Sequence, residues 1–228
     1  MCVAYSGIAA SLLYKGSTCH SAFAIPLSAA PGMRCNVEPN SVKAEVLRHT
    51  KILIWDEISM ASSHIIDAVD DLFRQLMRKP LEAFGGKIVI CGGDFRQVLP
   101  VVQFGNRAQN MEVIAKNSAC WTQVQHLYLT RNVRAAADPT FAEWILGVGN
   151  GTEIETMVDE VPKITLPEYI RMSNDIAREI FDGYFSDLAE DYASASRRVI
   201  LCATNEDVRK MNDHTAPYVI YKNDLFSV

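Results

Sequence analysis

The stretch that decides the fold is KILIWDEISM at residues 51–60, together with a second apolar run, KIVICGGDF, at 87–95. Each run holds about five apolar residues rich in β-branched side chains, which is typical of strands buried on both faces of a sheet. Between them, residues 62–79 place apolar side chains at helical spacing, with Ser62 or Ser63 able to cap the start. A short Phe-Gly-Gly turn precedes the second run. Strand, helix and strand in this order predict a parallel βαβ unit and an α/β fold.

Four more elements are predicted downstream. They are strands over 125–135 (QHLYLTRNVRA) and 199–203 (VILCA), a helix from Pro139 to Gly149 or Gly151, and an amphipathic helix over 173–188 capped by Ser173 or Asn174. Residues 152–170 are predicted to be a connection. A domain boundary is expected near 131–138, which divides the chain into residues 1–133 and 134–228.

The composition of the 228-residue chain is globular, with 49% hydrophobic and 21% charged residues, which excludes disorder throughout. No apolar run reaches the roughly 18–20 residues that a membrane helix needs, and the first residues lack the basic start of a signal peptide. The six cysteines are scattered without a CxxC pair, so neither a zinc site nor a disulfide framework is expected. A reducing intracellular compartment fits best.

The net charge of −5 is unevenly distributed along the chain. Residues 152–196 carry 3 Lys/Arg against 11 Asp/Glu, whereas residues 1–151 carry 14 against 12. No acidic residue precedes Glu38. A surface that binds phosphate groups is therefore compatible with the first part of the chain, although charge alone does not argue for one.

Asp56 and Glu57 follow the first predicted strand directly, and an apolar strand that delivers two adjacent acids is the pattern of a Walker B motif. Asp56 would hold Mg²⁺, because a hard cation prefers oxygen ligands. Glu57 would polarise the water that attacks the γ-phosphate of ATP. The alternative is an ordinary strand followed by a solvated acidic turn.

The second candidate segment is GGDFRQVLPVV at 92–102. Two glycines allow the backbone to approach a ligand closely, and Asp94, Arg96 and Gln97 follow within four positions. A glutamine here can hydrogen-bond both a water and a phosphate oxygen, which suits a sensor of the γ-phosphate. The alternative is a glycine-rich turn with solvated side chains.

The third segment is GIAASLLYKGSTCHSAF at 7–23. Its small residues, its hydroxyl groups and its lack of acids suit contacts to the backbone of a nucleic-acid strand. The alternative for His20, taken alone, is a core histidine with a satisfied partner.

The fourth segment is LTRNVR at 129–134, close to the expected domain boundary. Arg131 or Arg134 could reach across a cleft to a transferring phosphate. The alternative is a pair of surface arginines.

Together, these segments in this order resemble the PIF1-like helicases, including the helicase domains of Helitron-type elements. The matching stretches are GIAASLLYKGSTCHSAFAIPL (7–27), ILIWDEISM (52–60), FGGKIVICGGDFRQVLPVV (84–102), LYLTRNVR (127–134), FAEWILGVGNG (141–151) and VILCATNEDVRKMND (199–213). The resemblance implies RecA-like parallel sheets of a P-loop NTPase. It also implies a superfamily 1B motor that hydrolyses ATP, moves 5′ to 3′ on single-stranded DNA and unwinds duplexes.

The resemblance assigns roles to four residues around the nucleotide, with ATP and Mg²⁺ as cofactors. Asp56 and Glu57 correspond to the magnesium-binding and water-activating acids. Gln97 corresponds to the γ-phosphate sensor, and Arg134 corresponds to an arginine finger.

The DNA contacts implied by the resemblance come from an earlier segment. Thr18, His20 and Ser21 fall in the stretch that lines the path of single-stranded DNA. The expected partners are single-stranded DNA and duplex junctions, without a membrane, and the motor is expected to act as a monomer. The expected compartment is the nucleus, with the mitochondrion as the alternative.

The chain also departs from the family pattern. The family opens with a phosphate loop, GxGGxGKT, and no GK[ST] occurs anywhere in these 228 residues. We therefore expect an internal piece of a helicase: residues 1–133 from the first RecA-like domain and 134–228 from the start of the second. Such a piece is not expected to hydrolyse ATP alone. The alternatives are an inactive helicase-derived fragment that at most binds nucleic acid, and a P-loop ATPase unrelated to DNA.

Overall fold

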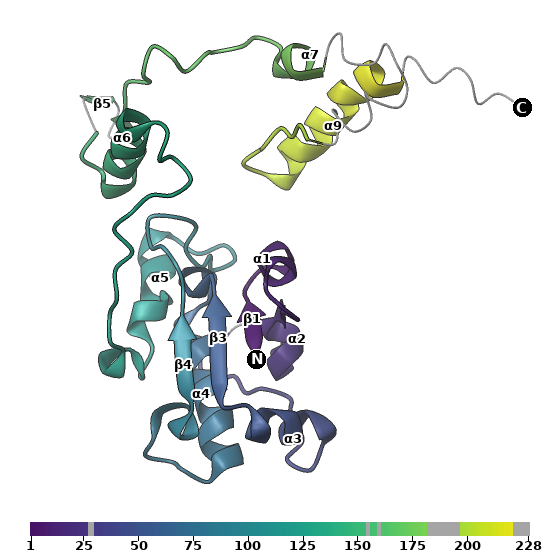
Figure 1. The fold of residues 1–228 in the computed structure, drawn as a ribbon, viewed down its shortest axis with the longest axis vertical. Helices are drawn as coiled ribbons and strands as arrows, with labels where there is room; N and C mark the ends of the chain where they lie inside the picture. Colours follow the sequence, from purple (N-terminus) through teal and green to yellow (C-terminus); the bar gives the residue numbers. More distant parts are fainter. Residues whose placement is uncertain (27–29, 154–155, 159–160, 182–196, 221–228) are drawn as a thin grey trace, which may run out of the picture. The chain divides into compact units, whose positions relative to one another are not determined.

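The computed structural model describes residues 1–26, 30–153, 156–158, 161–181 and 197–220 (Figure 1). It forms two compact units, Met1–Ile164 and Thr165–Val228. The elements of the first unit are β1 (Cys2–Ala4), α1 (Gly7–Leu12), β2 (Ser17–Thr18), α2 (Cys19–Phe23), α3 (Val42–His49), β3 (Ile52–Asp56), η1 (Ile58–Met60), α4 (Ser63–Met77), η2 (Ala83–Gly86), β4 (Ile88–Cys91), α5 (Arg107–Glu112), η3 (Ala115–Asn117), η4 (Trp121–Gln123), α6 (Pro139–Asn150), β5 (Thr156–Val158) and β6 (Val161–Lys163). The second unit contains α7 (Ile176–Phe181) and α9 (Asn205–Ile220). The predicted boundary near residue 133 lies inside the first unit, and the assignment of the units to two RecA-like domains stays a prediction.

The main sheet is parallel throughout, with the strand order β2-β1-β3-β4. Strand β1 lies between β2 and β3, so that Val3 is opposite both Ser17 and Trp55. In Figure 1 the arrowheads of β3 and β4 lie side by side and point to the same end of the unit. The prediction of a parallel βαβ unit over β3, α4 and β4 is confirmed, and with it the α/β fold class.

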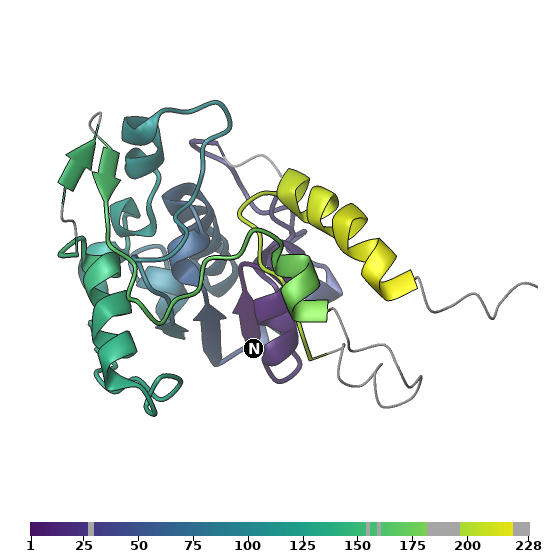
Figure 2. The same ribbon diagram turned by 90° about the horizontal axis from the view of Figure 1, so that it is seen from above.

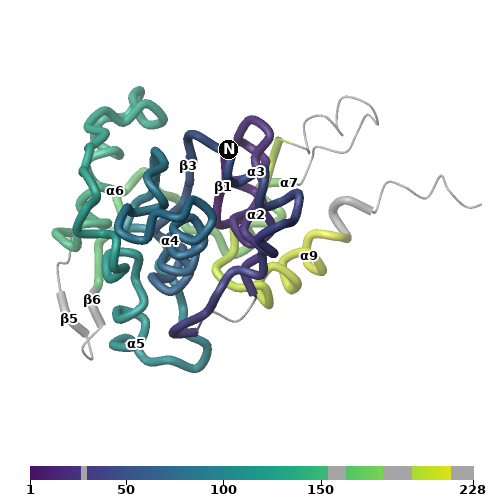
Figure 3. Tube along the Cα trace, turned by 90° about the horizontal axis from the view of Figure 1, so that it is seen from below, coloured from purple at the N-terminus to yellow at the C-terminus, as the bar shows by residue number. Residues whose placement is uncertain are grey.

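Helix α4 forms where the periodicity predicts it and covers one face of the sheet (Figures 1, 2 and 3). Ser62 caps its start by accepting a hydrogen bond from the Ile65 N–H, and the helix ends at Arg78 in a left-handed conformation. Its buried apolar side chains, including Phe73, belong to one core cluster with Leu53 and Trp55 of β3. This burial fixes the position of β3.

The opposite face of the same strands is open to solvent. Ile52 and Ile54 of β3 are 44% and 38% exposed, and their partners Ile88 and Ile90 on β4 are 60% and 53% exposed. The prediction that both strands are buried on both faces is therefore wrong. An apolar run indicates a strand, but only a covering element can bury its second face, and no described element of the first unit covers this one.

Two predicted strands are irregular in the structure. In the stretch 125–135, Leu127 and Leu129 are 87% and 103% exposed, and in the stretch 199–203, Leu201 is 88% exposed. A strand is stabilised by pairing with a neighbour, and neither stretch pairs with another strand in the described part of the chain. Both strand predictions are wrong.

The helix predictions fare better. Helix α6 begins at Pro139, with the Asp138 carboxylate accepting from the Phe141 N–H, and ends at Gly151 in a left-handed conformation, as predicted. The stretch 152–170, predicted to be a connection, contains two short strands, since β5 and β6 pair in an antiparallel arrangement.

Helix α7 confirms only the start of the helix predicted over 173–188. Its cap is Asp175, which accepts from the Arg178 N–H, rather than Ser173 or Asn174. Residues 182–188 lie outside the described residues. In the part of the chain that the structure covers, no helix has the length and apolar character needed to cross a membrane.

Candidate nucleotide and nucleic-acid site

Asp56 and Glu57 lie at the carboxyl end of β3, where the parallel strands of the sheet all end. Both side chains are half-buried. Asp56 Oδ1 accepts a hydrogen bond of 3.0 Å from the Glu57 N–H, which closes a tight turn around the carboxylate. The turn follows directly from a strand whose alternate residues are held in the core.

The backbone of Glu57 is left-handed, with φ 53° and ψ 40°. This conformation costs a residue with a Cβ about 1–2 kcal/mol relative to the right-handed region. Such outliers persist where the surrounding structure determines them, and they concentrate at functional sites. Here the conformation lies between the end of β3 at Asp56 and the start of η1 at Ile58.

The loop after β4 packs directly on this acidic turn. The Gly92 N–H donates to the Trp55 carbonyl and the Gly92 carbonyl accepts from the Ile58 N–H, both at 2.9 Å. A Cβ at Gly92 would lie 3.0 Å from Asp56 Oδ1, and one at Gly93 would lie 3.0 Å from the Ser59 nitrogen. The two glycines are therefore required for the close approach that brings this loop onto the acidic turn.

Gln97 lies in the next turn of this loop, whose Asp94 carbonyl accepts from the Gln97 N–H at 3.1 Å. The Gln97 side chain is exposed, and in the described residues no hydrogen bond joins it to Asp56 or Glu57. The structure thus places Gln97 on the loop that contacts the acidic turn but leaves its side chain open to solvent.

Two neighbours of Gln97 tie the loop to later parts of the first unit. The Arg96 guanidinium pairs with Asp94 and donates to Asn150 Oδ1 at 2.7 Å, at the end of α6. Phe95 packs edge-on against Trp121, with ring centroids 5.7 Å apart. The sequence contains no signal for these contacts, since they join residues 26 and 54 positions apart.

Arg131 and Arg134 are exposed, and neither forms a hydrogen bond or ion pair within the described residues. They lie in the irregular stretch where a strand is predicted. The structure does not bring either arginine to the two acids, so the role of Arg134 stays a prediction.

Thr18, His20 and Ser21 lie together where β2 passes into α2, at the same end of the sheet as the acids. The Thr18 hydroxyl caps α2 by accepting from the Ser21 N–H at 3.2 Å. His20 contacts the Tyr5 ring edge-on, and burial lowers the pKa of the imidazole below its usual value, so the ring is neutral at pH 7.

A cation that the sequence does not reveal lies beside this segment. Lys43 Nζ donates to the Ser21 carbonyl at 2.7 Å, from a helix 22 positions further along the chain. The positive charge that phosphate contacts need is therefore present next to Thr18 and Ser21.

The residues at the acidic turn fit a magnesium ion held in part by a nucleotide. In the described residues no group of three or more His, Cys, Asp or Glu side chains is arranged to hold a metal. Mg²⁺ in nucleotide sites keeps several waters and takes only one or two carboxylates plus phosphate oxygens. Asp56 with Glu57 beside it, below the closely approaching Gly92 backbone, matches that requirement.

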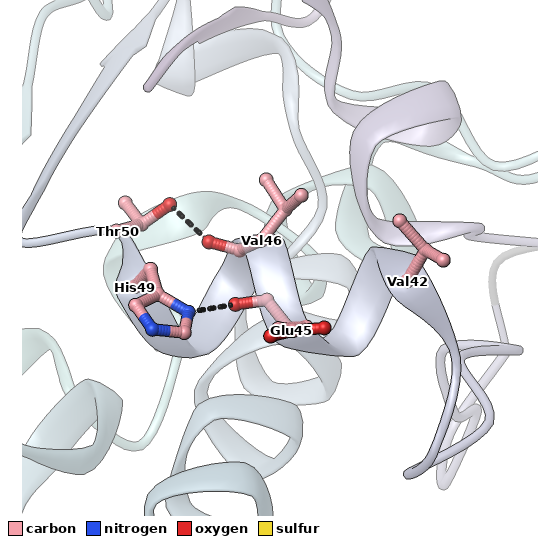
Figure 4. Close-up of a pocket in the computed structure, with 5 residues that line it drawn as sticks. All are labelled: Val42, Glu45, Val46, His49 and Thr50. Carbon is pink, nitrogen blue, oxygen red and sulfur yellow. Dashed lines mark hydrogen bonds between the residues drawn. The ribbon is translucent and has the colours of Figure 1, made fainter.

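The surface hollow drawn in Figure 4 lies elsewhere, on the exposed side of α3. It is lined by Val42, Glu45, Val46, His49 and Thr50, and two of these side chains contact backbone carbonyls of the same helix. Thr50 Oγ1 donates to the Val46 carbonyl at 2.9 Å, and His49 Nδ1 lies 2.9 Å from the Glu45 carbonyl. This hollow presents no convergent polar groups and is not the candidate site.

A parallel sheet that presents an acid pair and a glycine loop at one edge is the architecture of the RecA-like domain of helicase motors. Residues 1–159 match the PIF1-like helicase family, and the chain belongs to that family.

The relatives agree with this membership. The chain is 32% identical over 145 residues to the ATP-dependent DNA helicase PIF1 of Emericella nidulans, covering 62% of this chain and 19% of that protein. It is 27% identical over 216 residues to the ATP-dependent DNA helicase Pif1 of a Psychrobacter species, covering 92% of this chain and 29% of that protein. The chain thus spans less than a third of either relative.

Solved structures show the same fold. The Bacteroides Pif1 helicase in complex with ADP-AlF3 and single-stranded DNA superposes with a TM-score of 0.67 at 25% identity, over 98% of this chain and 47% of that one. A structure of two coordinating Pif1 helicases at forked double-stranded DNA superposes with a TM-score of 0.62 at 24% identity, over 93% and 46% of the chains. The RecA-like fold class is confirmed. The expectation of a motor that acts as a monomer gains no support from the second structure.

Proposed function

We propose that the chain forms part of an ATP-dependent DNA helicase, in which ATP hydrolysis drives 5′-to-3′ movement on single-stranded DNA and duplex unwinding. The observation that carries this proposal is the pair of 2.9 Å backbone hydrogen bonds that place the loop after β4 on the Asp56–Glu57 turn. An acid pair in contact with a loop that carries a candidate γ-phosphate sensor supplies part of what nucleotide hydrolysis requires.

In this proposal, Asp56 holds Mg²⁺, which neutralises charge on the phosphates. Glu57 orients the attacking water and accepts its proton. Gln97 contacts the γ-phosphate when the Asp94–Gln97 turn closes on bound ATP, and Arg134 reaches the same phosphate from a neighbouring domain. Because the Gln97 and Arg134 side chains are exposed, closure of the motor around ATP must bring both inward.

DNA contacts in this proposal come from the end of β2. Thr18 and Ser21 present hydroxyl groups to phosphates, with Lys43 beside them supplying charge. The neutral His20 ring is available to pack against a sugar or base. The hydrolysis and DNA sites then both lie at the carboxyl end of the sheet, on β3 and β2, with β1 between them.

A second candidate is a helicase-derived piece that binds nucleic acid without turnover. The observation in its favour is the absence of GK[ST] from the 228 residues. A P-loop ATPase offsets the charge of a triphosphate with backbone N–H groups, a helix start and a lysine. We expect no ATPase activity from the 228 residues alone.

ATPase and unwinding assays decide between the two. The 228-residue chain and the same chain preceded by a family phosphate-loop segment are compared with and without single-stranded DNA. DNA-stimulated turnover in the longer protein alone, with unwinding of 5′-tailed but not 3′-tailed duplexes, supports the helicase. No turnover in the longer protein, with DNA binding retained, supports the non-hydrolysing piece.

Sedimentation of the longer protein on DNA tests the proposed monomer, and localisation tests the proposed nuclear or mitochondrial compartment.

A further inference from the structure

The turn between α1 and β2 has a fixed shape. The Gly16 N–H donates to the Leu13 carbonyl at 3.0 Å, which makes Tyr14 and Lys15 the two central residues of a β-turn. Lys15 has φ 49°, in the left-handed region. A Cβ at Gly16 would lie 2.2 Å from the Ala10 carbonyl oxygen, so this glycine packs the turn tightly against α1. The two central side chains are therefore presented on a rigid support.

This turn presents an aromatic ring and a cation to solvent. Tyr14 is 81% exposed, and Lys15 Nζ lies 5.5 Å from the centre of its ring. Ile8 and Leu12, one helical turn apart on α1, are 80% and 82% exposed. An exposed aromatic ring with aliphatic neighbours and an adjacent cation offers a face for stacking and a charge for phosphate.

The surroundings of the turn favour a polyanion as its occupant. Residues 1–37 contain Lys15 and Arg34 and no acidic residue. The turn leads directly into β2, which ends at Thr18, and the Ser21 carbonyl that accepts from Lys43 follows in α2. A strand of nucleic acid bound at Thr18 and Ser21 therefore has the turn as a neighbour along the chain. Positive charge without acids and a free aromatic face match the backbone and bases of such a strand.

We propose that the Tyr14–Lys15 turn is a nucleic-acid contact, in which Tyr14 stacks on an unpaired base and Lys15 contacts a neighbouring phosphate. The inference rests on the proposed function at the end of β2 and adds a base contact to its backbone contacts. Stacking on an aromatic ring contributes about 5- to 150-fold to affinity per base and tolerates any base.

The test is the affinity of the 228-residue chain for a fluorescent 20-nucleotide oligothymidylate, measured by anisotropy over a range of salt concentrations. Tyr14→Ala is expected to weaken binding by about 5- to 150-fold, and Tyr14→Trp is expected to restore it. An abasic strand of equal length should be bound equally well by the parent and by Tyr14→Ala. Tyr128→Ala is the matched control, because Tyr128 is 83% exposed in another segment.

Lys15→Gly tests the contribution of the Lys15 charge to DNA binding without a loss of stability. Glycine relieves the left-handed backbone at residue 15, so the variant should be at least as stable as the parent in a thermal melt. The slope of log affinity against log salt should become shallower by about 0.7, the value for one phosphate contact on a single strand.

The possible failures are distinguishable. If the parent chain does not bind the oligonucleotide, both the inference and the DNA part of the proposed function are overturned. If the parent binds and Tyr14→Ala binds equally well, or loses affinity equally for the abasic strand, only the stacking inference is overturned. If Tyr14→Ala instead changes self-association in light scattering and leaves DNA binding intact, the turn contacts protein and the inference is wrong.

Discussion

The turn after β3 and the stretch 127–134 both carry residues predicted for the nucleotide site, yet their surroundings are opposite. Glu57 lies in a turn bound by two backbone hydrogen bonds to the loop after β4 and supported by the core beneath β3. Arg134 lies in an irregular stretch, its side chain is exposed, and it forms no hydrogen bond among the described residues. The sheet holds the residues at the ends of neighbouring strands in place, whereas no strand pairing in the described part of the chain fixes the position of Arg134, although it belongs to the same compact unit as Glu57.

The largest effect on turnover is expected at Arg134, for which the described residues show no hydrogen bond or ion pair. In a protein that carries a phosphate-loop segment, Arg134→Lys keeps the charge but loses the planar guanidinium, so kcat should fall by about 10³-fold or more while single-stranded DNA binding survives. Steady-state ATPase assays measure the change. Arg131→Lys is the matched control, and a larger loss in that variant would transfer the role to Arg131.

Glu57→Gln tests the acidic turn after β3, which the sheet holds in place. Loss of a positioned general base should lower turnover by about 10²- to 10⁴-fold in the same longer protein and leave nucleotide affinity largely intact. Single-turnover hydrolysis and nucleotide binding are measured on the same preparation. Glu45→Gln, at an exposed acid on α3, should hydrolyse normally. Turnover within a few-fold of the parent in Glu57→Gln would mean that another group activates the water.

Phe73→Ala tests whether the core beneath β3 supports the acidic turn. Phe73 is fully buried against Phe23, and its truncation should lower the free energy of unfolding by about 3–5 kcal/mol. Urea denaturation followed by tryptophan fluorescence measures it. Leu81→Ala, at a side chain that is 92% exposed, should change stability by less than about 0.5 kcal/mol.

A methyl group added where the loop after β4 contacts the acidic turn is expected to have a smaller effect on stability. In Gly93→Ala the new Cβ would lie 3.0 Å from the Ser59 nitrogen and 3.1 Å from Ile58 Cγ2, so the loop must shift. Overpacking of this kind costs about 1–3 kcal/mol in stability. Gly7→Ala, where a Cβ meets nothing within 4 Å, is the control and should be neutral in the same denaturation assay.

The smallest effect on stability is expected on the open face of the sheet. Ile54→Lys and Ile90→Lys place charge on side chains that are 38% and 53% exposed, so unfolding free energy should change by about 0.5 kcal/mol or less. Solubility should rise and binding of a hydrophobic dye should fall, because the apolar patch is interrupted. Unchanged dye binding in both variants would show that this face is covered in solution.

The sequence predicts the parts of the fold that depend on local pattern. Strands β3 and β4, helix α4 and its Ser62 cap all follow from periodicity and capping chemistry within about 45 residues. The stretch 125–135 has equally good strand composition, but pairing depends on a neighbouring strand, which composition does not encode.

The same distinction holds for the site. The position of Asp56 and Glu57 at a strand end is readable from the sequence. The contacts of Arg96 with Asn150 and of Lys43 with Ser21 are not, because they join residues 54 and 22 positions apart without any shared motif.

The left-handed backbone of Glu57 sets a limit on how far this protein can be stabilised. Glycine at position 57 would remove the conformational cost and give a more robust fold, with the carboxylate lost. In a screen for thermostability, selection therefore favours loss of the acid, and in a screen for activity it favours keeping a strained turn. Under the proposed role of Glu57, engineering a more stable protein from this chain has to keep the glutamate at residue 57 and gain stability elsewhere.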